Sequence, residues 1–513
     1  MKEASTKRIT KNTITLTLRM FITMGISIYS SRIILQALGV VDYGIYNVIS
    51  GVISMFSFLN TSMVASTQRF LNYSLGEKDY SKTAKIFSTS INLHFILSIL
   101  LVIVAEAVGV YFLNHQLEIP SERLVAANII FQFTIITAVA NIISVPYKAL
   151  IIAYEKMSIY AYEAIFQSVA TLLASFIILY THNDRLILYA FLLMSIGIII
   201  RLFDSWYCSH RLSYKYHYII DKNLYKEILS FSGWSTLVTM AHLAYTQGTI
   251  FLINVFFGPA INAAQALANQ VNLSLLTFNS NFVMAVKPQI IKSYAEKDLA
   301  YMKQLLIYSL KISCLIMGIV TFPFIIKTDY ILNLWLKEVP TYTHEFLQLA
   351  LILSIFVSFS DPITTAIQAT GKIRNYQITE FLFLISILPC TYFLFKLNYQ
   401  PYSTYYIRIF IFIILLIVRL LFLKLTFNFK FQFFLFNVIL RVILSIGCSA
   451  TILYYIGNFM PDNLCNFIIL CFLSLIVNGI CALYITFNKS ERQFITNTIY
   501  AKLTRKNKLS QQL

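Results

Sequence analysis

Charged residues are scarce in this chain: they make up 12% of its 513 residues, whereas hydrophobic residues make up 58%. Soluble globular domains typically carry about 25% charged residues, so the composition excludes a soluble, multidomain protein. The mean hydropathy is +0.71, and apolar segments recur along the chain with no soluble block between them. We therefore predict a single polytopic membrane domain.

Motifs that carry chemistry are also missing. The seven cysteines lie in or beside apolar segments and form no C-x-x-C pair, which excludes the usual zinc and redox motifs. The sequence contains no P-loop, no G-x-S-x-G motif and no cluster of metal ligands. We predict that the protein is not an enzyme, that it has no cofactor and no metal, and that this chain performs no ATP-driven step.

Acidic residues are few, with 22 Asp and Glu against 40 Lys and Arg, which gives a net charge of +18. Such a charge can indicate a nucleic-acid partner. Here the cations are spread over many short loops instead of gathering on one segment, so we predict no nucleic acid. The better explanation is the excess of positive charge that membrane proteins carry on their cytoplasmic loops.

Membrane spans need about 20 largely apolar residues, and the hydropathy pattern predicts fourteen of them. Their approximate ranges are 14–37, 45–68, 86–113, 124–147, 159–181, 187–208, 232–257, 264–286, 305–326, 345–367, 377–397, 404–425, 433–457 and 465–487. The fourth and the eighth are the most polar. The apolar run 14–38 is too long for a signal peptide, so we expect it to remain as the first transmembrane helix.

Loop charges give the orientation. Of the 40 Lys and Arg residues, 28 fall in the two termini and the even-numbered loops, and only 5 fall in the odd-numbered loops. Positive charge stays on the cytoplasmic side. We therefore predict that both termini and all even-numbered loops are cytoplasmic.

An internal repeat with an offset of 219 residues relates residues 39–79 to residues 258–298 without a gap. Membrane proteins built from two like halves are usually transporters, with the substrate path between the halves. The repeat predicts a six-helix lobe at 1–208, a cytoplasmic connecting loop at 209–227 and a second six-helix lobe at 228–430. Two extra helices and a basic cytoplasmic tail follow at 431–513. The matching positions are Gly39 and Gly258, Asn60 and Asn279, Ser74 and Ser293, and the Glu-Lys-Asp motifs at 77–79 and 296–298.

Three cations inside predicted spans are candidates for binding an anionic substrate. They are Arg19 and Arg32 on the first helix and Lys311 on the ninth. A charged group at membrane depth is costly unless it faces water or protein partners, so the alternative for each is a structural contact. For Arg408 and Arg419, near helix ends, we expect instead that the long side chain carries its charge to the membrane interface.

Amide side chains recur on single faces of two helices. The eighth carries Asn269, Asn272 and Asn279, and the seventh carries Gln247 and Asn254. Amides on one helical face can bond sugar hydroxyls or neighbouring helices. For the eighth helix we favour a wet cavity that binds sugar.

Two carboxylates are weaker candidates for ion coupling, namely Asp361 and Glu163. Asp361 precedes Pro362, which removes a backbone donor and is expected to kink or interrupt the tenth helix. A carboxylate there could bind a cation or a proton, or it could cap the start of a new helix segment.

Three stretches of the sequence carry a family resemblance. Residues 32–46, RIILQALGVVDYGIY, resemble the first-helix and loop pattern of bacterial polysaccharide flippases of the Wzx type. Their superfamily of multidrug, oligosaccharidyl-lipid and polysaccharide exporters (MOP) also contains the MATE drug exporters. Residues 76–79, GEKD, resemble the second cytoplasmic loop of these flippases, and residues 145–157, VPYKALIIAYEKM, resemble the end of their fourth helix and the loop beyond.

The resemblance implies two six-helix lobes around a cavity that opens alternately to either side of the bacterial inner membrane. The implied substrate is an undecaprenyl-diphosphate-linked oligosaccharide, flipped for assembly of a surface polysaccharide such as O-antigen lipopolysaccharide or capsule. Membrane lipid, a polysaccharide polymerase and chain-length proteins are the implied partners. The alternative function is a MATE-like, cation-coupled exporter of small molecules. A non-transporting scaffold or polymerase is disfavoured, because the odd-numbered loops are short.

Overall fold

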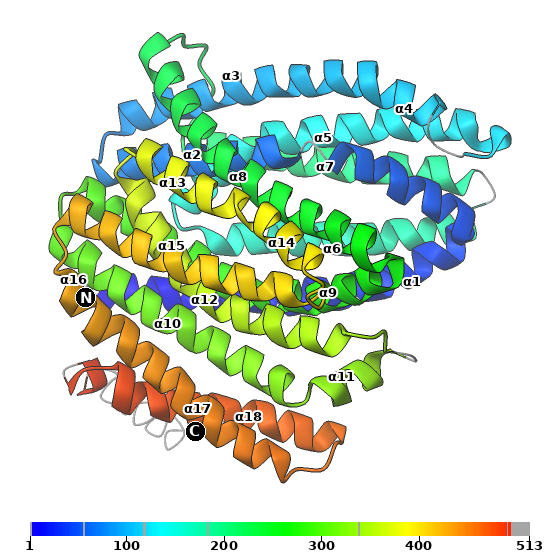
Figure 1. Ribbon diagram of the computed structural model, residues 1–513. Helices are drawn as coiled ribbons and strands as arrows, with labels where there is room; N and C mark the ends of the chain where they lie inside the picture. Colours follow the sequence, from blue (N-terminus) through cyan, green and yellow to red (C-terminus); the bar gives the residue numbers. More distant parts are fainter. Residues whose placement is uncertain are drawn as a thin grey trace, which may run out of the picture. The chain divides into compact units, whose positions relative to one another are not determined.

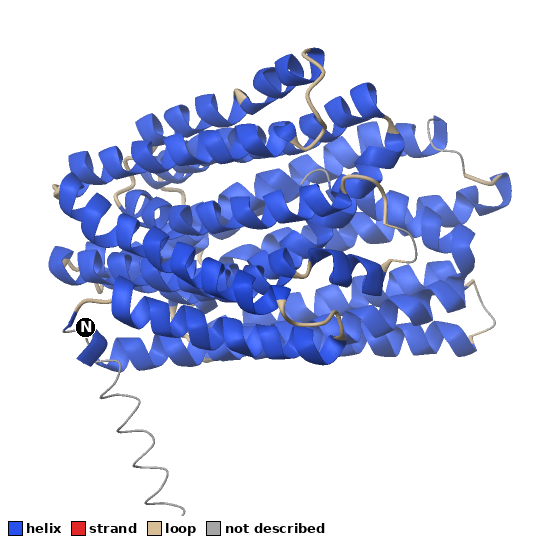
Figure 2. Ribbon diagram, turned by 60° about the horizontal axis from the view of Figure 1, so that its bottom comes forward, coloured by secondary structure: helices blue, strands red, loops and turns tan. Residues whose placement is uncertain are grey.

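The computed structural model describes residues 3–54, 57–115, 119–181, 184–336, 339–489 and 491–493. Within these ranges the regular secondary structure is helical and contains no strand (Figure 2). The first seven helices (Figure 1) are α1 (Glu3–Ser54), α2 (Ser57–Gly76), α3 (Tyr80–Val104), α4 (Val110–His115), α5 (Leu124–Ala153), α6 (Met157–Tyr180) and α7 (Arg185–His210). This result confirms the predicted all-α fold.

The remaining helices form the rest of the described chain and correspond to the second half of the sequence repeat and the C-terminal addition. They are α8 (Lys222–Phe257), α9 (Pro259–Ala295), α10 (Leu299–Ile326), α11 (Thr328–Trp335), α12 (Thr343–Ala369), α13 (Arg374–Ile385), α14 (Ile387–Lys396), α15 (Ser403–Phe427), α16 (Phe431–Phe434), α17 (Leu440–Asn458) and α18 (Leu464–Cys481). The basic tail beyond residue 493 lies outside the described residues.

Twelve helices among the described residues are long and apolar enough to cross a membrane, so the chain is a multi-pass membrane protein. Two of the fourteen predicted spans, 45–68 and 264–286, are not among the twelve, although both ranges are helical where they are described. The range 264–286 belongs to α9, whose polar side chains lower its hydropathy. The count of fourteen spans therefore stays a prediction.

Two glycines at matching positions of the repeat interrupt the helices in the same way. Gly39 breaks the regular helix inside α1 with φ at 73°, and Gly258 separates α8 from α9 with φ at 84°. Positive φ is unfavourable for residues with a Cβ and is readily adopted by glycine. The repeat seen in the sequence is thus also present in the backbone.

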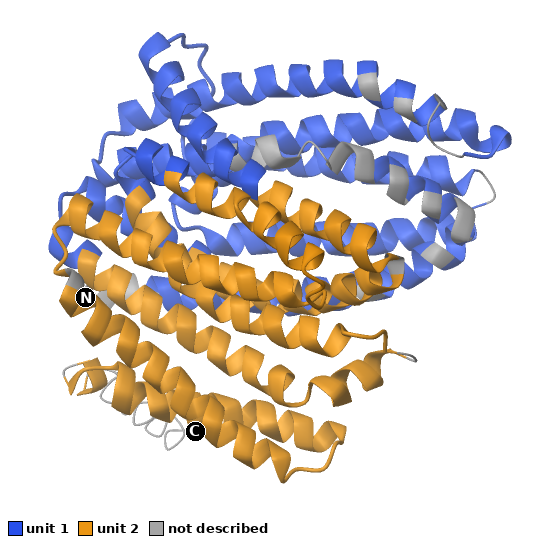
Figure 3. Cartoon of the chain, in the orientation of Figure 1, with its two compact units in different colours: residues 1–241, 284–302, 368–378 blue, residues 242–283, 303–367, 379–513 orange. Residues whose placement is uncertain are grey.

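The chain forms two compact units (Figure 3). Unit 1 comprises residues 1–241, 284–302 and 368–378, and unit 2 comprises residues 242–283, 303–367 and 379–513. The lobes predicted from the repeat, 1–208 and 228–430, follow the sequence halves instead. The difference arises because unit 1 continues to residue 241, within α8, and also includes 284–302 and 368–378, which contain the ends of α9 and α12.

Those segments belong to unit 1 because even-numbered loops lie together there. Glu155, in the fourth loop, accepts a bond from Lys292 Nζ at 2.9 Å. Arg69, after the second predicted span, donates from Nη2 to the backbone oxygen of Ala369 at 3.0 Å. Within unit 1, loop four therefore contacts loop eight, and loop two contacts loop ten.

The odd-numbered loops of unit 1 meet in a separate cluster. Arg123 donates from Nε to Asp42 at 2.9 Å and from Nη1 to Asp184 at 2.6 Å, which joins loops one, three and five. Helix α5 runs for 30 residues between the two clusters, a rise of about 45 Å. The described loops of unit 1 thus alternate between two ends.

We predict that the even-numbered end is cytoplasmic. In a chain whose natural cysteines are replaced, single cysteines at Lys78, Lys215 and Lys297 should react with a membrane-impermeant maleimide only in permeabilised cells. A cysteine at Thr341, exposed in the ninth loop, should react in intact cells. Lys337 in the same loop lies outside the described residues. The opposite pattern would reject the orientation, and a mixture among the first three sites would reject the alternation of loops.

Candidate functional site

The two arginines predicted to bind an anion lie on α1, in unit 1. Arg19 is partly exposed, and its guanidinium carbon lies 5.0 Å from the ring centroid of Tyr160 on α6. This distance is within the range of a cation–π contact. Arg32 is exposed. Both side chains therefore present positive charge at the surface of unit 1 instead of burying it.

Glu163, one of the two candidates for ion coupling, is buried on α6 with 7% of its surface exposed. Asp204 on α7 is fully buried, and the two carboxyl groups interact electrostatically. Arg201, one turn before Asp204, places its guanidinium carbon 4.1 Å from the ring centroid of Tyr147. Sequence reasoning missed this pairing of acids, because the two residues come from different helices.

Two of the candidate sugar-binding amides on α9 bond to neighbouring helices of unit 2. Asn269 Oδ1 accepts from the hydroxyl of Tyr405 on α15 at 3.0 Å. Asn272 Oδ1 accepts from the hydroxyl of Ser354 on α12. Both asparagines remain partly exposed. These contacts correspond to the helix-joining role that the sequence left open beside sugar binding.

Asn279, the third amide, is buried at 1% exposure and connects three helices. Its Nδ2 donates to Asp361 on α12 at 3.0 Å, and its Oδ1 accepts from Ser313 on α10. Helix α12 runs through Pro362 as one element, so the expected interruption is absent and Asp361 does not cap a new helix. The structure thus brings two predicted site residues, Asn279 and Asp361, into direct contact.

The remaining predicted amides, Gln247 and Asn254, are exposed on α8. Between them, Thr249 is fully buried and accepts a bond from Arg408 on α15. Arg408 itself is only 5% exposed. Its charge is therefore held inside unit 2, and it does not reach the interface as we expected from the sequence.

Lys311 is paired with an acid that lies 180 residues away in the sequence. Its side chain is 1% exposed, and its Nζ lies 2.8 and 3.1 Å from the two carboxylate oxygens of Glu491. Glu491 belongs to the segment after α18. Participation of Lys311 in anion binding would therefore require displacement of Glu491.

A second buried ion pair joins α13 and α15. Arg419 donates from Nη2 to Glu380 at 2.5 Å and from Nη1 to Ser360 at 2.8 Å. The side chains of the arginine and the glutamate are 3% and 6% exposed. The expectation that Arg419 reaches the membrane interface is therefore wrong, because a carboxylate on the adjacent helix neutralises it.

The family model gives the family of this chain, and solved structures give its fold. The model of the polysaccharide biosynthesis protein family matches residues 9–294. No curated protein matches the sequence. Solved structures of a MATE transporter in the bent and the straight conformation superpose with TM-scores of 0.71 and 0.70, each at 13% identity over 83% of this chain and 96% of that chain. A MOP superfamily transporter from Pyrococcus furiosus gives 0.67 at 13% identity, over 82% of this chain and 96% of that chain. At this identity the likeness shows a shared fold.

The ion pair of Lys311 and Glu491 gives a prediction about stability. Breaking a buried pair by removing one partner leaves an uncompensated charge and typically costs about 3–5 kcal/mol. Lys311→Met and Glu491→Gln should each lower the melting temperature of the purified protein, and the double variant should recover most of the loss. Lys396→Met, at an exposed position, is the control. Additive losses in the double variant would show that the two side chains are not coupled.

Proposed function

Since the chain belongs to the polysaccharide biosynthesis protein family, we propose that it flips undecaprenyl-diphosphate-linked oligosaccharide repeat units across the bacterial inner membrane by alternating access. The observation that carries the proposal is the family match over residues 9–294, which is more than half of the chain. The shared fold with MATE transporters supports a transport role. Both termini would be cytoplasmic, and the exported unit would pass to a polysaccharide polymerase and chain-length proteins.

The diphosphate of such a substrate needs fixed positive charge, because a phosphate group leaves water at a large electrostatic cost. Arg19 and Arg32 are our first candidates. Both are at least partly exposed, and a guanidinium can bind phosphate oxygens through two parallel hydrogen bonds. Lys311 is a later candidate, because Glu491 already neutralises it.

The sugar needs hydrogen-bonding groups that are not used up by contacts inside the protein. Gln247 and Asn254 are exposed. The contacts of Asn269 and Asn272 engage their amide oxygens, and an amide also carries two N–H donors that suit sugar hydroxyls. Asn279 uses both its oxygen and its nitrogen within unit 2, so we propose that it supports the site more than it contacts sugar.

Ion coupling is proposed for Glu163 and Asp361, each of which has a second polar group close by. Glu163 interacts with Asp204, and Asp361 accepts a bond from Asn279. A carboxylate at membrane depth is costly without compensating charge, so Glu163 beside Asp204 and Asp361 beside Asn279 are candidates to bind a coupling cation. This arrangement would let a gradient of protons or cations drive the conformational cycle.

Deletion of the gene tests the proposed substrate. Loss of a flippase should leave lipid-linked repeat units accumulated on the cytoplasmic side and should abolish the surface polysaccharide. Both can be measured, by mass spectrometry of extracted lipids and by staining of the polysaccharide. Unchanged lipid-linked pools together with new drug sensitivity would instead support a MATE-like exporter.

Substitution of Arg19 tests the proposed anion site. Arg19→Ala should abolish complementation of the deletion while the protein still inserts, because the charge for the diphosphate is lost. Arg19→Lys should retain part of the activity, since it keeps the charge and loses the two-pronged geometry. Arg211→Ala, which removes an exposed loop cation, should complement fully. Normal export by Arg19→Ala, Arg32→Ala and Lys311→Ala alike would show that the anion is bound elsewhere.

A further inference from the structure

The two copies of the Glu-Lys-Asp motif build the same turn, one after α2 and one after α9. In each copy three consecutive backbone amides donate to the last turn of the preceding helix, at 2.8–3.1 Å. The central residues, Lys78 and Lys297, both have φ at 59°. The aspartates each accept a bond from a backbone amide three residues later, at 2.8 Å for Asp79 and 3.0 Å for Asp298. The repeat therefore holds at the level of individual hydrogen bonds.

Gly76, the last residue of α2, lies against its own counterpart in the second copy. With the offset of 219 residues that counterpart is Ala295. A Cβ built on Gly76 would lie 2.7 Å from Ala295 Cβ and 2.7 Å from the backbone oxygen of Lys292. A residue that touches its own counterpart lies beside the axis that relates the two copies, as in a self-complementary contact between subunits. The ends of α2 and α9 thus meet at this axis. The two helices lie so close together there that position 76 of α2 has no room for a side chain.

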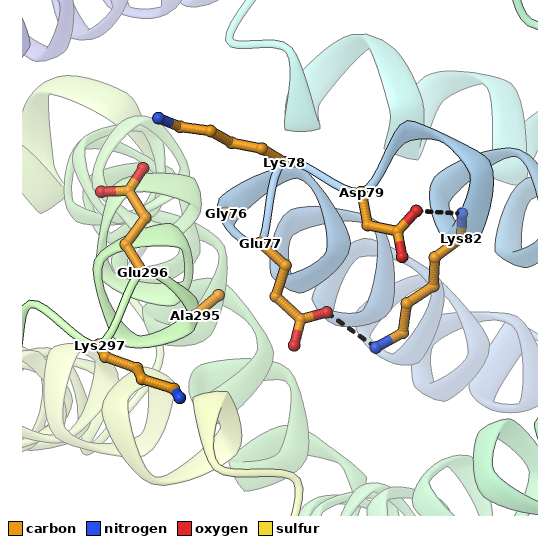
Figure 4. A pocket seen from close by; sticks show the side chains of 8 residues that line it. All are labelled: Gly76, Glu77, Lys78, Asp79, Lys82, Ala295, Glu296 and Lys297. Atoms are coloured by element: carbon orange, nitrogen blue, oxygen red, sulfur yellow. Dashed lines mark hydrogen bonds and ion pairs between the residues drawn. The ribbon is translucent and has the colours of Figure 1, made fainter.

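An open pocket of about 700 Å³ is lined by both turns (Figure 4). On the side of the first copy, Lys82 Nζ donates to Glu77 at 2.8 Å. The lining contains three acidic and three basic side chains and therefore has no excess charge that would select an anion such as a diphosphate. The residues that line it are Gly76, Glu77, Lys78, Asp79, Lys82, Ala295, Glu296 and Lys297. Its composition fits a hydrated space between two contacting helix ends.

Glu155, in the turn between α5 and α6, holds the same end of α9 by charge. Its side chain is 5% exposed, and Oε1 accepts from Gln289 Nε2 at 2.6 Å and from Lys292 Nζ at 2.9 Å. Arg8 Nη1 lies 3.7 Å from the other carboxylate oxygen. Lys292 thus takes part in both contacts, because its backbone lies against Gly76 and its ammonium group binds Glu155. The two contacts form one connected structure within unit 1.

We propose that the Gly76–Ala295 contact and the Glu155–Lys292 ion pair form the gate at the predicted cytoplasmic end of the transport path. The inference rests on the proposed function, because alternating access requires this end to open once in every cycle. Both contacts can separate without unfolding a helix. The first is a touch between small residues at two helix ends, and the second is an ion pair that water can solvate when the partners move apart.

The test measures opening of the contact separately from transport. A single cysteine replaces Ser293, which is 2% exposed, in a chain without its natural cysteines, and a membrane-impermeant maleimide is added to inside-out vesicles. Gly76→Val should raise the labelling rate by about tenfold or more, since overpacking destabilises a close contact. Glu155→Gln should also raise it, because Lys292 loses its partner. Gly233→Val is the matched control, because no neighbouring atom lies within 4 Å of a Cβ built there.

A swap across the axis keeps the test valid if the valine variant does not insert. Gly76→Ala should speed labelling, and adding Ala295→Gly should slow it again, because the methyl group has moved to the opposite side of the contact. Unchanged labelling in inserted Gly76→Ala and Glu155→Gln, or no rescue by the swap, would overturn the gate. Normal export by a rapidly labelled variant would overturn it as well. Normal lipid-linked pools after gene deletion would reject the proposed substrate and leave the labelling comparison intact.

Discussion

Inside a bilayer no water is present to bond the backbone or to solvate charge. This constraint accounts for most features of the fold described here. Backbone groups are satisfied within helices, so the described ranges contain helix and no strand. Two buried cations are matched by carboxylates from other segments of unit 2. Arg419 binds Glu380 at 2.5 Å, and Lys311 binds Glu491 at 2.8 Å. Each pair fixes two segments against each other, because separating the partners would leave a charge without compensation.

Because of the same constraint, the buried cations and the exposed cations have different roles. Lys311 and Arg419 are buried and neutralised by carboxylates, so they contribute to the stability of unit 2. Arg19 and Arg32 remain at least partly exposed on α1. A cation that keeps access to water or to a ligand is the kind that can exchange partners during transport, which is why the proposed diphosphate site is placed on α1.

The internal repeat places the proposed gate where its two copies meet. Both copies end a helix with the same turn, and the two turns meet where Gly76 touches Ala295. Equivalence of the copies is incomplete at this point, because one position is glycine and the other alanine. A close approach of two helix ends tolerates one methyl group but not two. Small residues at the axis therefore permit contact, and the ion pair of Glu155 with Lys292 adds an electrostatic attraction.

Hydropathy, loop charge and the 219-residue offset are properties of the linear chain, and they were sufficient to predict the all-α membrane fold and the alternation of loops, whereas the family was predicted from the resemblance of residues 32–46, 76–79 and 145–157 to known flippases. A span or a positively charged loop depends on residues that are near one another in sequence. Which side chains bond to one another depends instead on their distance in space. The sequence pattern of α10 does not reveal that Lys311 bonds to Glu491, 180 residues away. The same holds for Glu155 and Lys292, 137 residues apart, and for the amides of α9 that bond to α12 and α15. Only the tertiary structure decided which polar groups are satisfied inside the protein and which remain exposed, because the low-dielectric interior rewards pairing between whichever helices are adjacent.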